Sequence, residues 1–586
     1  MADKALSKKV TVAEIFSFFG SILGPERNYF LLAVVYGVGI SGLSLALPIS
    51  VQMLVNTVAN TGLRTPLFVL SGTLFVLLLA AGLLYLLRVH LMDLFQRRFY
   101  ARMVSEIALR SIYAINPFFQ DRRLGSLFNR YFDIIIVQKA VPDLLIGGFT
   151  IVLQAAFGFI LVSMYHPLFL AFNLIVVLII WLIWIIWGGR AIRSAVEVSH
   201  TKHAAAAWLE GLGGSNGFFK SERHIAEALQ RTDDVTGAYM KQHVSHFRNH
   251  FSQAICFVLL YASASAGLLG LGGFLVIEGE LTLGQLVAAE LVLTGVFVGI
   301  SQFGTYLAYF YELCAALDEL SLFYDVEQEE ADVDEEAFEG DASIQFVKAR
   351  GDARGHQCTL DFTIRSGARV LASADTHGEQ RELTSFLKRH QRPSSGYIAL
   401  GGNDINGIQA HALRQQIIVL DRPNAIEMTI REYLKLSGDG ASSHRILEAL
   451  RVVGLETPIA QLEDGLDTHI ASTGWPLTIT ETMQLKLAAA LIAQPRVLVL
   501  GQLFDTMPDE FLERSMDMLQ ESGQTTIIYF SARHRNLGFD SYLYLGYSEQ
   551  HLFGSFDDFC EHADGRLCAT GPMTGGDDPA PLTPAM

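Results

Sequence analysis

The sequence predicts a two-part membrane protein, in which six membrane-spanning helices precede an α/β domain with a mostly parallel sheet. The first observation is composition: charged residues make up 18% of the 586 residues, below the roughly 25% of soluble domains, and the mean hydropathy is +0.32. The second is that long apolar runs fill only the first half of the chain. The third is that short apolar strands alternate with helical stretches in the second half, which is typical of βαβ units.

Each apolar run is about 20 residues or longer, which is the length that crosses a bilayer. An even number of spans places both termini on one side of the membrane. We expect the six spans at 29–54, 67–92, 141–165, 167–189, 251–278 and 282–310.

The orientation follows from the basic residues of the loops. Many Arg and Lys residues lie in 93–140 and 190–250, whereas the loops on the other side hold little beyond Arg64. Because positive loops remain in the cytoplasm, both termini and the C-terminal half are predicted to be cytoplasmic. The two long loops contain few helix breakers, so we expect their helices to continue on the order of 30 Å beyond the membrane.

Composition also sets the domain boundaries and excludes some functions. The net charge of −17 excludes a nucleic-acid-binding protein that relies on bulk basic charge. The five cysteines have no CxxC spacing, so we expect neither a disulfide framework nor a metal site. The N-terminus lacks a signal-peptide pattern, and the spans themselves would direct insertion. The predicted parts are an interfacial helix at 1–25, a transmembrane domain at 26–324, an acidic linker at 325–341, an α/β domain at 342–562 and a disordered tail at 563–586.

This layout resembles half of an exporter-type ABC transporter, and the C-terminal domain carries landmarks in that family's order. The segment 367–387 (GARVLASADTHGEQRELTSFL) is similar to the strand, phosphate loop and helix that open the family's ATP-binding domain, and 485–500 (LKLAAALIAQPRVLVL) to the signature helix and Walker B strand. Further similar segments are 394–405, 413–434 and 465–474. The resemblance covers nearly the whole chain. It implies an all-α six-helix ABC exporter domain, a P-loop-NTPase-like α/β domain, dimerisation, and ATP with magnesium as cofactors.

The residues that would hold the phosphates differ from the family pattern. A Walker A loop needs glycines for its backbone cradle, a Lys for the phosphates and a Ser/Thr for magnesium. Here Gly378 is the one remaining glycine, Gln380 replaces the Lys, and Arg381 and Glu382 replace the Ser/Thr. Nearby carboxylates would repel a polyphosphate by about 1 kcal/mol per contact in water. They belong to Asp375, Glu379 and Glu382.

The other nucleotide-binding positions differ as well. The Walker B strand runs into Gly501 and Gln502, so the magnesium-binding Asp and the catalytic Glu are both replaced. Asp421 stands at the Q-loop glutamine, and Ala532 at the switch histidine, although a two-residue slip would place His534 there. The signature motif LSGGQ is matched by LTITE, with Thr478 at the serine.

The replacements predict a pseudo-ATPase with no bound nucleotide. ABC sites are composite, each formed by Walker A of one half and the signature of the other. An intact partner would therefore still meet Thr478 and Glu481 at its own site. The alternative is a divergent site that still binds ATP through Arg381 and His377.

Three smaller signals leave alternatives open. Glu290 is a charge inside a predicted span and is a candidate for a translocation pathway, unless it reaches water at the outer end. The break GLGGSNGFF at 211–219 matches the family's coupling helix, but a plain turn explains it equally. Histidines with helical spacing could form a zinc or pH-sensing cluster, although solvated or core histidines are commoner. They are His200, His203, His243, His246 and His250.

The sequence thus predicts a dimeric subunit of an ABC-type export system in a bacterial inner membrane, with little or no ATP hydrolysis of its own. Its partners would be the lipid bilayer and a second ABC half, identical or different. The first alternative is a non-transporting membrane scaffold or regulator. The second is an ATP-driven exporter with a divergent but working site.

Overall fold

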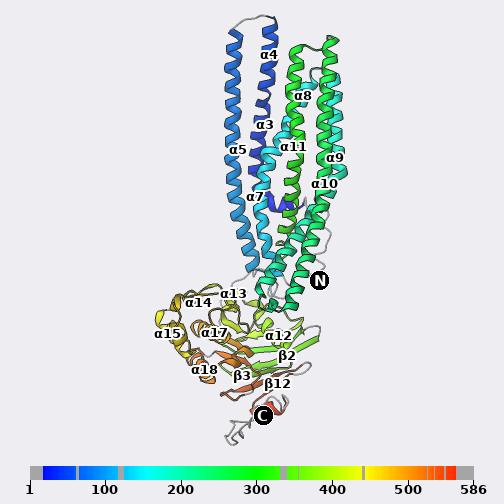
Figure 1. Ribbon diagram of the computed structural model, residues 1–586. Coiled ribbons are helices and arrows are strands. Elements are labelled where there is room, and N and C mark those ends of the chain that lie inside the picture. Colours follow the sequence, from blue (N-terminus) through cyan, green and yellow to red (C-terminus); the bar gives the residue numbers. More distant parts are fainter. Residues whose placement is uncertain are drawn as a thin grey trace. The chain divides into compact units, whose positions relative to one another are not determined.

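The computed structural model describes residues 17–60, 65–115, 124–329, 340–353, 356–438, 442–523, 525–533, 535–546 and 550–562. The chain divides into two compact units, Met1–Glu329 and Glu330–Met586 (Figure 1). Each unit has its own hydrophobic cores. The unit boundary falls inside the predicted acidic linker.

The described residues of the first unit form helices joined by short non-helical segments. Six of its helical segments are long and apolar enough to cross a membrane, which confirms the predicted number. Short turns of other helix types connect them: η1 (Phe19–Leu23), η2 (Gly24–Glu26), η3 (Leu124–Phe132), η4 (Leu144–Gly148) and η5 (Phe218–Lys220). The α-helices are α3 (Arg27–Ser44), α4 (Ala46–Asn60), α5 (Thr65–Ile112), α7 (Asp133–Asp143), α8 (Phe149–Ser163), α9 (Pro167–Gly214), α10 (Glu222–Ile277) and α11 (Leu283–Ser321).

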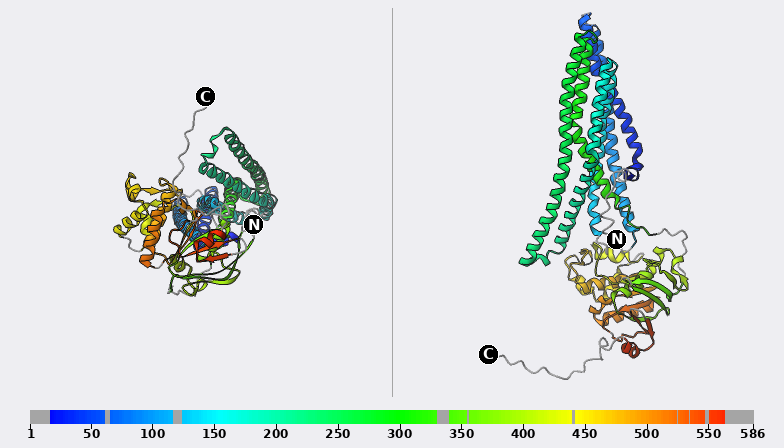
Figure 2. Two further views of the ribbon diagram at one scale, coloured as in Figure 1. Left: turned by 90° about the horizontal axis from the view of Figure 1, so that it is seen from below. Right: turned by 90° about the vertical axis from the view of Figure 1, so that its right-hand side faces the viewer.

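Local sequence explains where the longest helices begin. Pro167 follows the N-cap His166, whose ring nitrogen accepts a hydrogen bond from the N–H of Leu168 at 3.2 Å. Ser221 caps α10, and Thr282 forms a capping box with Gln285 at the start of α11. Such caps satisfy N–H groups that have no partner inside a helix. Figure 2 shows α9 and α10 as a long pair of neighbouring helices.

This unit exposes much more apolar surface than a protein in water does. Large hydrophobic side chains of α5, such as Phe68 and Phe75, are 74% and 67% exposed. In the most apolar window of α5 none of the residues is buried inside the structure. Contiguous exposed apolar faces of this extent mark contact with lipid or another protein, and lipid is the environment in which a bundle of such helices is stable. The chain is a multi-pass membrane protein.

The second unit is built on a six-stranded sheet with the order β12-β11-β3-β10-β9-β6, in which only β12 is antiparallel to its neighbour. The central strands β9 (VLVL) and β10 (TIIYF) are mainly apolar because both faces of a parallel sheet are covered. All residues of β9 and β10 are buried. The strands are β3 (Arg369–Ala374), β6 (Ile417–Leu420), β9 (Val497–Leu500), β10 (Thr526–Phe530), β11 (Ser541–Leu545) and β12 (Gln550–Phe553).

A second, antiparallel sheet has the order β2-β1-β4-β5, and β7 pairs with β8. These strands are β1 (Ile344–Ala353), β2 (His356–Ile364), β4 (Ser395–Leu400), β5 (Asn403–Asp404), β7 (Met428–Thr429) and β8 (His469–Ile470). The helices are α12 (His377–Leu387), α13 (Ala410–Gln416), α14 (Ile430–Leu436), α15 (Ser443–Val452), α16 (Glu456–Ala460), α17 (Ile479–Ala493), α18 (Asp509–Gly523) and α19 (Phe556–His562). The predicted α/β class is confirmed.

The structure also describes parts of the predicted interfacial helix, the break at 211–219 and the cysteines. The described part of the predicted interfacial helix is one π-helical turn and one 3₁₀ turn, η1 and η2. The break at 211–219 is a tight turn followed by the single 3₁₀ turn η5. Cys256, Cys314 and Cys358 are free thiols, and Cys560 is disulfide-bonded. The predicted tail at 563–586 lies outside the described residues.

Candidate functional site

The positions that resemble a nucleotide site gather at one edge of the six-stranded sheet. Each of these positions follows the carboxyl end of a strand. Asp375 comes directly after β3, Asp421 after β6 and Gly501 after β9, and Ala532 is the second residue after β10. These four strands are mutually parallel, so their carboxyl ends meet at the edge where open α/β sheets bind ligands. The structure therefore brings these sequence-predicted positions together.

The phosphate loop itself is almost absent. Strand β3 ends at Ala374 and helix α12 begins at His377, so only two residues connect them. Gly378 and the three residues after it are already part of the helix. A Walker A loop encloses phosphates with the backbone N–H groups of an open, glycine-rich turn. With two connecting residues and a single glycine, this segment lacks the open turn that forms that cradle.

The beginning of α12 is closed by a carboxylate of its own. Thr376 is the N-cap, and its hydroxyl accepts a hydrogen bond from the N–H of Gly378 at 3.1 Å. The N–H of Thr376 donates to Glu379 Oε2 at 3.0 Å, and its hydroxyl donates to the same oxygen. Glu379 is only 3% exposed. A helix N-terminus favours an anion, and here Glu379 supplies it.

Two further predicted residues serve packing. Gln380 and Glu382 are 3% and 5% exposed, and Gln391 Nε2 donates to Glu382 Oε1 at 3.3 Å. A Cβ on Gly351 of β1 would lie 1.8 Å from that same oxygen. The glycine thus makes room for Glu382 between strand and helix, and this carboxylate stands where the family has a magnesium-binding hydroxyl.

The signature position repeats the arrangement at α12. Thr478 caps α17, and its N–H and hydroxyl both donate to Glu481 Oε2 at 2.8 Å. The N–H of Glu481 donates back to Thr478 Oγ1 at 3.2 Å. The N-termini of α12 and α17, which the sequence resemblance aligns with the Walker A and signature helices, therefore both carry an internal carboxylate cap.

Asp505, which the sequence analysis did not single out, joins the loops after β9 and β10. Its Oδ1 accepts hydrogen bonds from the hydroxyls of Tyr529 and of Ser531, the latter at 2.7 Å. Its Oδ2 accepts from the N–H of Ala532, the switch position, at 2.9 Å. Burial and the neighbouring Asp505 raise the pKa of Tyr529, so the phenol stays a neutral donor. His534, the alternative switch residue, lies outside the described residues.

Gly501 leaves little room for the missing Walker B aspartate. Its N–H donates to Leu420 O at 2.9 Å, which draws β9 close to the loop after β6. A Cβ on Gly501 would lie 3.0 Å from the Cα of Asp421. That contact is with backbone, so a larger residue requires the loop to move. Gln502 is exposed and carries no carboxylate.

His390 lies among basic side chains and gives the C-terminal unit an acid-sensitive residue. Burial and the positive charges of Arg414, Lys388 and Arg422 lower the pKa of His390 to about 3. An unfolded chain takes up this proton near pH 6.5, whereas the folded chain does not until about pH 3. The stability of the unit is therefore unaffected by His390 above pH 6.5. It decreases by up to about 1.4 kcal/mol per pH unit as the pH falls toward 3.

We expect His390→Gln to make this acid destabilisation shallower. The measurement is the thermal unfolding midpoint of the C-terminal unit in the full chain between pH 7.5 and 5, for wild type and variant. The control is His444→Gln, since the side chain of His444 is 87% exposed. An unchanged pH dependence in His390→Gln would contradict the assignment.

Four charged residues lie within the predicted spans, of which Asp143 and Glu278 are exposed whereas Arg88 and Glu290 are not. Glu290 on α11 is partly buried, and its Oε2 has no hydrogen-bond partner among the described residues. Arg88 on α5 was missed, although LLYLLRVHLM stands inside the predicted second span. It is 1% exposed and donates to Thr150 Oγ1 at 2.8 Å and to Ile146 O at 3.0 Å. Charges at membrane depth are costly and are often functional, so the pathway role of Glu290 remains a candidate beside Arg88.

The predicted histidine cluster would join α9 and α10, but the histidines that the structure places there contact other side chains. His200 Nε2 lies 2.9 Å from Asp318, and His203 Nε2 lies 2.6 Å from Asp133. His246 contacts Ser194 at 3.0 Å. In the part of the chain that the structure describes, no group of three or more His, Cys, Asp or Glu side chains is placed to hold a metal ion.

Known proteins provide an independent comparison. Residues 30–214 match the ABC transporter transmembrane region. The ABC multidrug transporter mdr2 of Aspergillus fumigatus is 26% identical over 573 residues, covering 91% of this chain and 69% of that protein. The leukotoxin translocation ATP-binding protein LktB of Mannheimia haemolytica is 25% identical over 267 residues, covering 44% of this chain and 38% of that protein.

A solved structure extends the likeness over both units. A bacterial Atm1-family ABC exporter with ATP bound superposes with a TM-score of 0.78 at 19% sequence identity, covering 92% of this chain and 97% of that one. The likeness concerns the fold. Together with the six spans and the parallel sheet, it shows that the chain has the fold of an ABC exporter half, with a transmembrane region of the ABC transporter type followed by an α/β domain.

Proposed function

We propose that this protein is a subunit of an ABC-type export system whose own nucleotide site neither binds nor hydrolyses ATP. The observation that carries the proposal is the pair of carboxylate caps, Glu379 on α12 and Glu481 on α17. They occupy the two helix N-termini that an ABC site turns toward phosphate. Each cap satisfies N–H groups that the nucleotide would otherwise use.

The chemistry of hydrolysis points the same way. Phosphoryl transfer needs a bound magnesium ion and a group that orients the attacking water. Gly501 and Gln502 stand at the positions of the magnesium-binding Asp and the catalytic Glu, and neither residue has a carboxylate. The buried Gln380 has no positive charge to offer a phosphate. Magnesium also prefers carboxylate and phosphate oxygens in octahedral geometry. The residues present do not fit Mg-ATP.

The subunit would work in a dimer, either with a second copy or with another ABC half. We place it in a bacterial inner membrane with the C-terminal unit in the cytoplasm, because the long loops are basic and positive loops stay inside. With an intact partner, Glu481 would face the partner's γ-phosphate. The energy for transport would then come from the composite site formed by the partner's Walker A loop and the altered signature segment of this chain.

A membrane scaffold or regulator is the second candidate. It is favoured by one observation: the α/β unit keeps buried cores on both sides of its sheet while its site is closed. Co-purification with an ABC half and movement of a substrate would separate a subunit from a scaffold. A working divergent site based on Arg381 and His377 is the third candidate, and nucleotide binding tests it directly.

We expect no saturable binding of a fluorescent ATP analogue, with magnesium, to the detergent-purified full chain at millimolar nucleotide. The double reversion Gln380→Lys, Arg381→Ser is also expected to fail, because Glu379 still closes the helix N-terminus. Adding Glu379→Gly removes that carboxylate and is expected to give measurable binding. Saturable, magnesium-dependent binding by the wild-type chain would overturn the proposal.

A further inference from the structure

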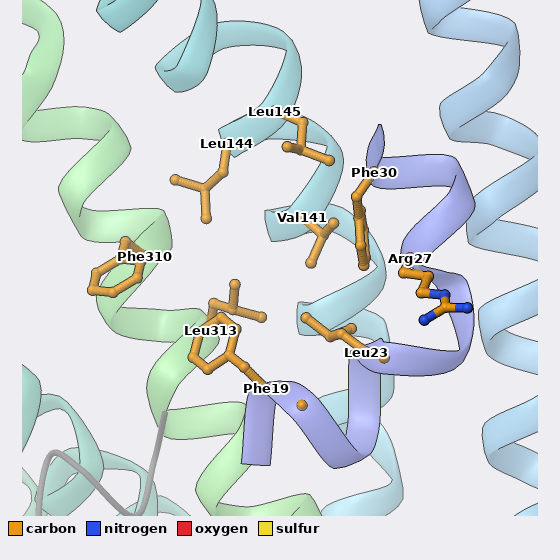
Figure 3. A pocket seen from close by; sticks show the side chains of 11 residues that line it. Phe19, Leu23, Arg27, Phe30, Val141, Leu144, Leu145, Phe310 and Leu313 are labelled. Carbon is orange, nitrogen blue, oxygen red and sulfur yellow. The ribbon is translucent and has the colours of Figure 1, made fainter. Parts of the chain in front are cut away.

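The membrane unit contains an apolar cavity near the start of α3. Its volume is about 420 Å³, and it is an open cavity lined by η1, η2, α3, α7, η4 and α11. Figure 3 shows a ring of apolar side chains around it, including Phe19, Leu23, Phe30 and Leu313. Among the described residues, Arg27 is the one charged residue that borders this cavity, and in Figure 3 its guanidinium group points away from the ring.

A second cavity of about 570 Å³ adjoins the first. It lies between α8, α9, α10 and α11, and its wall is rich in aromatic side chains such as Trp181, Trp184 and Phe303. Leu144, Leu145 and Phe310 line both cavities. The two cavities thus adjoin at η4, and together this apolar space extends from η2 along α11. Both volumes lie in the range of ligand pockets, roughly 300–1,000 Å³.

The segment between the cavities is held in place by contacts from two other helices. It is η4, a π-helical turn, and such turns occur often at functional sites. Tyr306 of α11 packs on its glycines, since a Cβ on Gly147 would lie 2.2 Å from the Tyr306 ring. Arg88 donates to the carbonyl of Ile146 in the same turn at 3.0 Å. Polar bonds on one side and an aromatic ring on the other hold Leu144 and Leu145 in place.

We propose that this space binds the hydrocarbon chain of a single-chain anionic amphiphile of the membrane, such as a fatty acid, with its head group beside Arg27. A compact polar ligand is disfavoured because the lining offers it almost no hydrogen-bonding groups. An extended chain matches two adjoining apolar cavities.

Charge selects the anionic head group. Arg27 is exposed and forms no ion pair among the described residues, whereas the adjacent Glu26 is already paired with Arg102 at 2.9 Å. A free cation at the end of an apolar cavity complements a carboxylate or phosphate. This inference does not rest on the state of the nucleotide site.

The test uses the purified full chain and a 16-carbon fatty acid that carries a diazirine at the end of its chain. Photolabelling is followed by mass spectrometry of peptides, with unlabelled palmitate as competitor. We expect saturable labelling within 141–152, 177–184 and 303–313. The corresponding long-chain alcohol, which has the same chain and no charge, should label at least fivefold less at equal concentration.

Leu144→Trp fills the space at the residue that both cavities share, and we expect it to reduce saturable labelling at least tenfold. Its matched control is Leu83→Trp, since Leu83 is 59% exposed on α5. Arg27→Gln should abolish the preference for acid over alcohol, whereas Arg97→Gln, at a side chain that is 75% exposed, should retain it.

The wild-type protein alone can overturn the proposal, so it does not depend on the folding of any variant. Labelling that does not saturate and spreads over the exposed face of α5 would mean contact with bulk lipid only. Equal labelling by acid and alcohol would remove the role of Arg27. In folded variants, labelling unchanged by Leu144→Trp would place the ligand elsewhere.

Discussion

Replacing Glu319 with alanine is expected to destabilise the membrane unit by about 3–5 kcal/mol, because it removes the acid of a buried ion pair with Arg130. The Glu319 side chain is fully buried, and its carboxylate accepts a hydrogen bond from Arg130 Nε across 189 residues of sequence. Arg130 belongs to η3 and Glu319 to the last turns of α11. The pair therefore joins the entry to the third span to the end of the sixth. The measurement is the free energy of unfolding in detergent, followed by loss of helical circular dichroism.

A surface ion pair provides the matched control. Glu227 and Arg231 lie one turn apart on α10, with side chains that are 52% and 60% exposed. Glu227→Ala should change stability by no more than about 0.5 kcal/mol, because water screens exposed pairs. A loss below about 1 kcal/mol in Glu319→Ala would mean that water reaches Arg130 when this carboxylate is removed, and that the pair is not an anchor of the bundle.

The sequence predicted those features that depend on local pattern. The six spans follow from the length of apolar runs, and β9, β10 and β11 follow from VLVL, TTIIYF and YLYL. The positions Asp421, Gly501 and Ala532 are at one sheet edge because each follows a parallel strand. None of this required knowledge of side-chain contacts.

The carboxylate caps could have been found in the sequence. Thr376-His-Gly-Glu379 and Thr478-Ile-Thr-Glu481 both fit the capping-box pattern T-x-x-E, which marks the first turn of a helix. The charge of Glu379 predicts repulsion of phosphate, whereas its hydrogen bonds with Thr376 follow from the capping-box pattern. Arg88 is likewise recognisable in the sequence as a charged residue inside an apolar span.

Other features depend on tertiary packing and have no local signal. The π-helical turn η4 is maintained by Arg88 of α5 and Tyr306 of α11, which lie 58 and 160 residues from Ile146 and are unrelated to it in pattern. The bonds of Asp505 to Tyr529, Ser531 and Ala532 join two loops that are about 25 residues apart. Such contacts are fixed only when the sheet has assembled.

Asp505→Ala is expected to destabilise the C-terminal unit by about 3 kcal/mol, because it leaves two buried hydroxyl groups without an acceptor, each at a cost of roughly 1–3 kcal/mol. Tyr529 and Ser531 are 4% and 2% exposed, so water cannot readily replace the carboxylate. The loss should be local to the edge of the sheet that carries the site. Amide hydrogen exchange of peptides covering 497–507 and 526–532 should therefore become roughly 100-fold faster.

Two variants separate this network from a general effect of lost charge. Asp505→Asn keeps an oxygen that can accept from Tyr529 and Ser531, and it should recover most of the protection. Asp509→Ala removes a carboxylate that is 40% exposed and paired with Arg535, and it should leave exchange at β9 and β10 unchanged. If Asp505→Ala exchanged like Asp509→Ala, the loops after β9 and β10 would be held by strand packing alone. In that case the site would be free to open, and its closure to nucleotide would rest on the caps at Glu379 and Glu481.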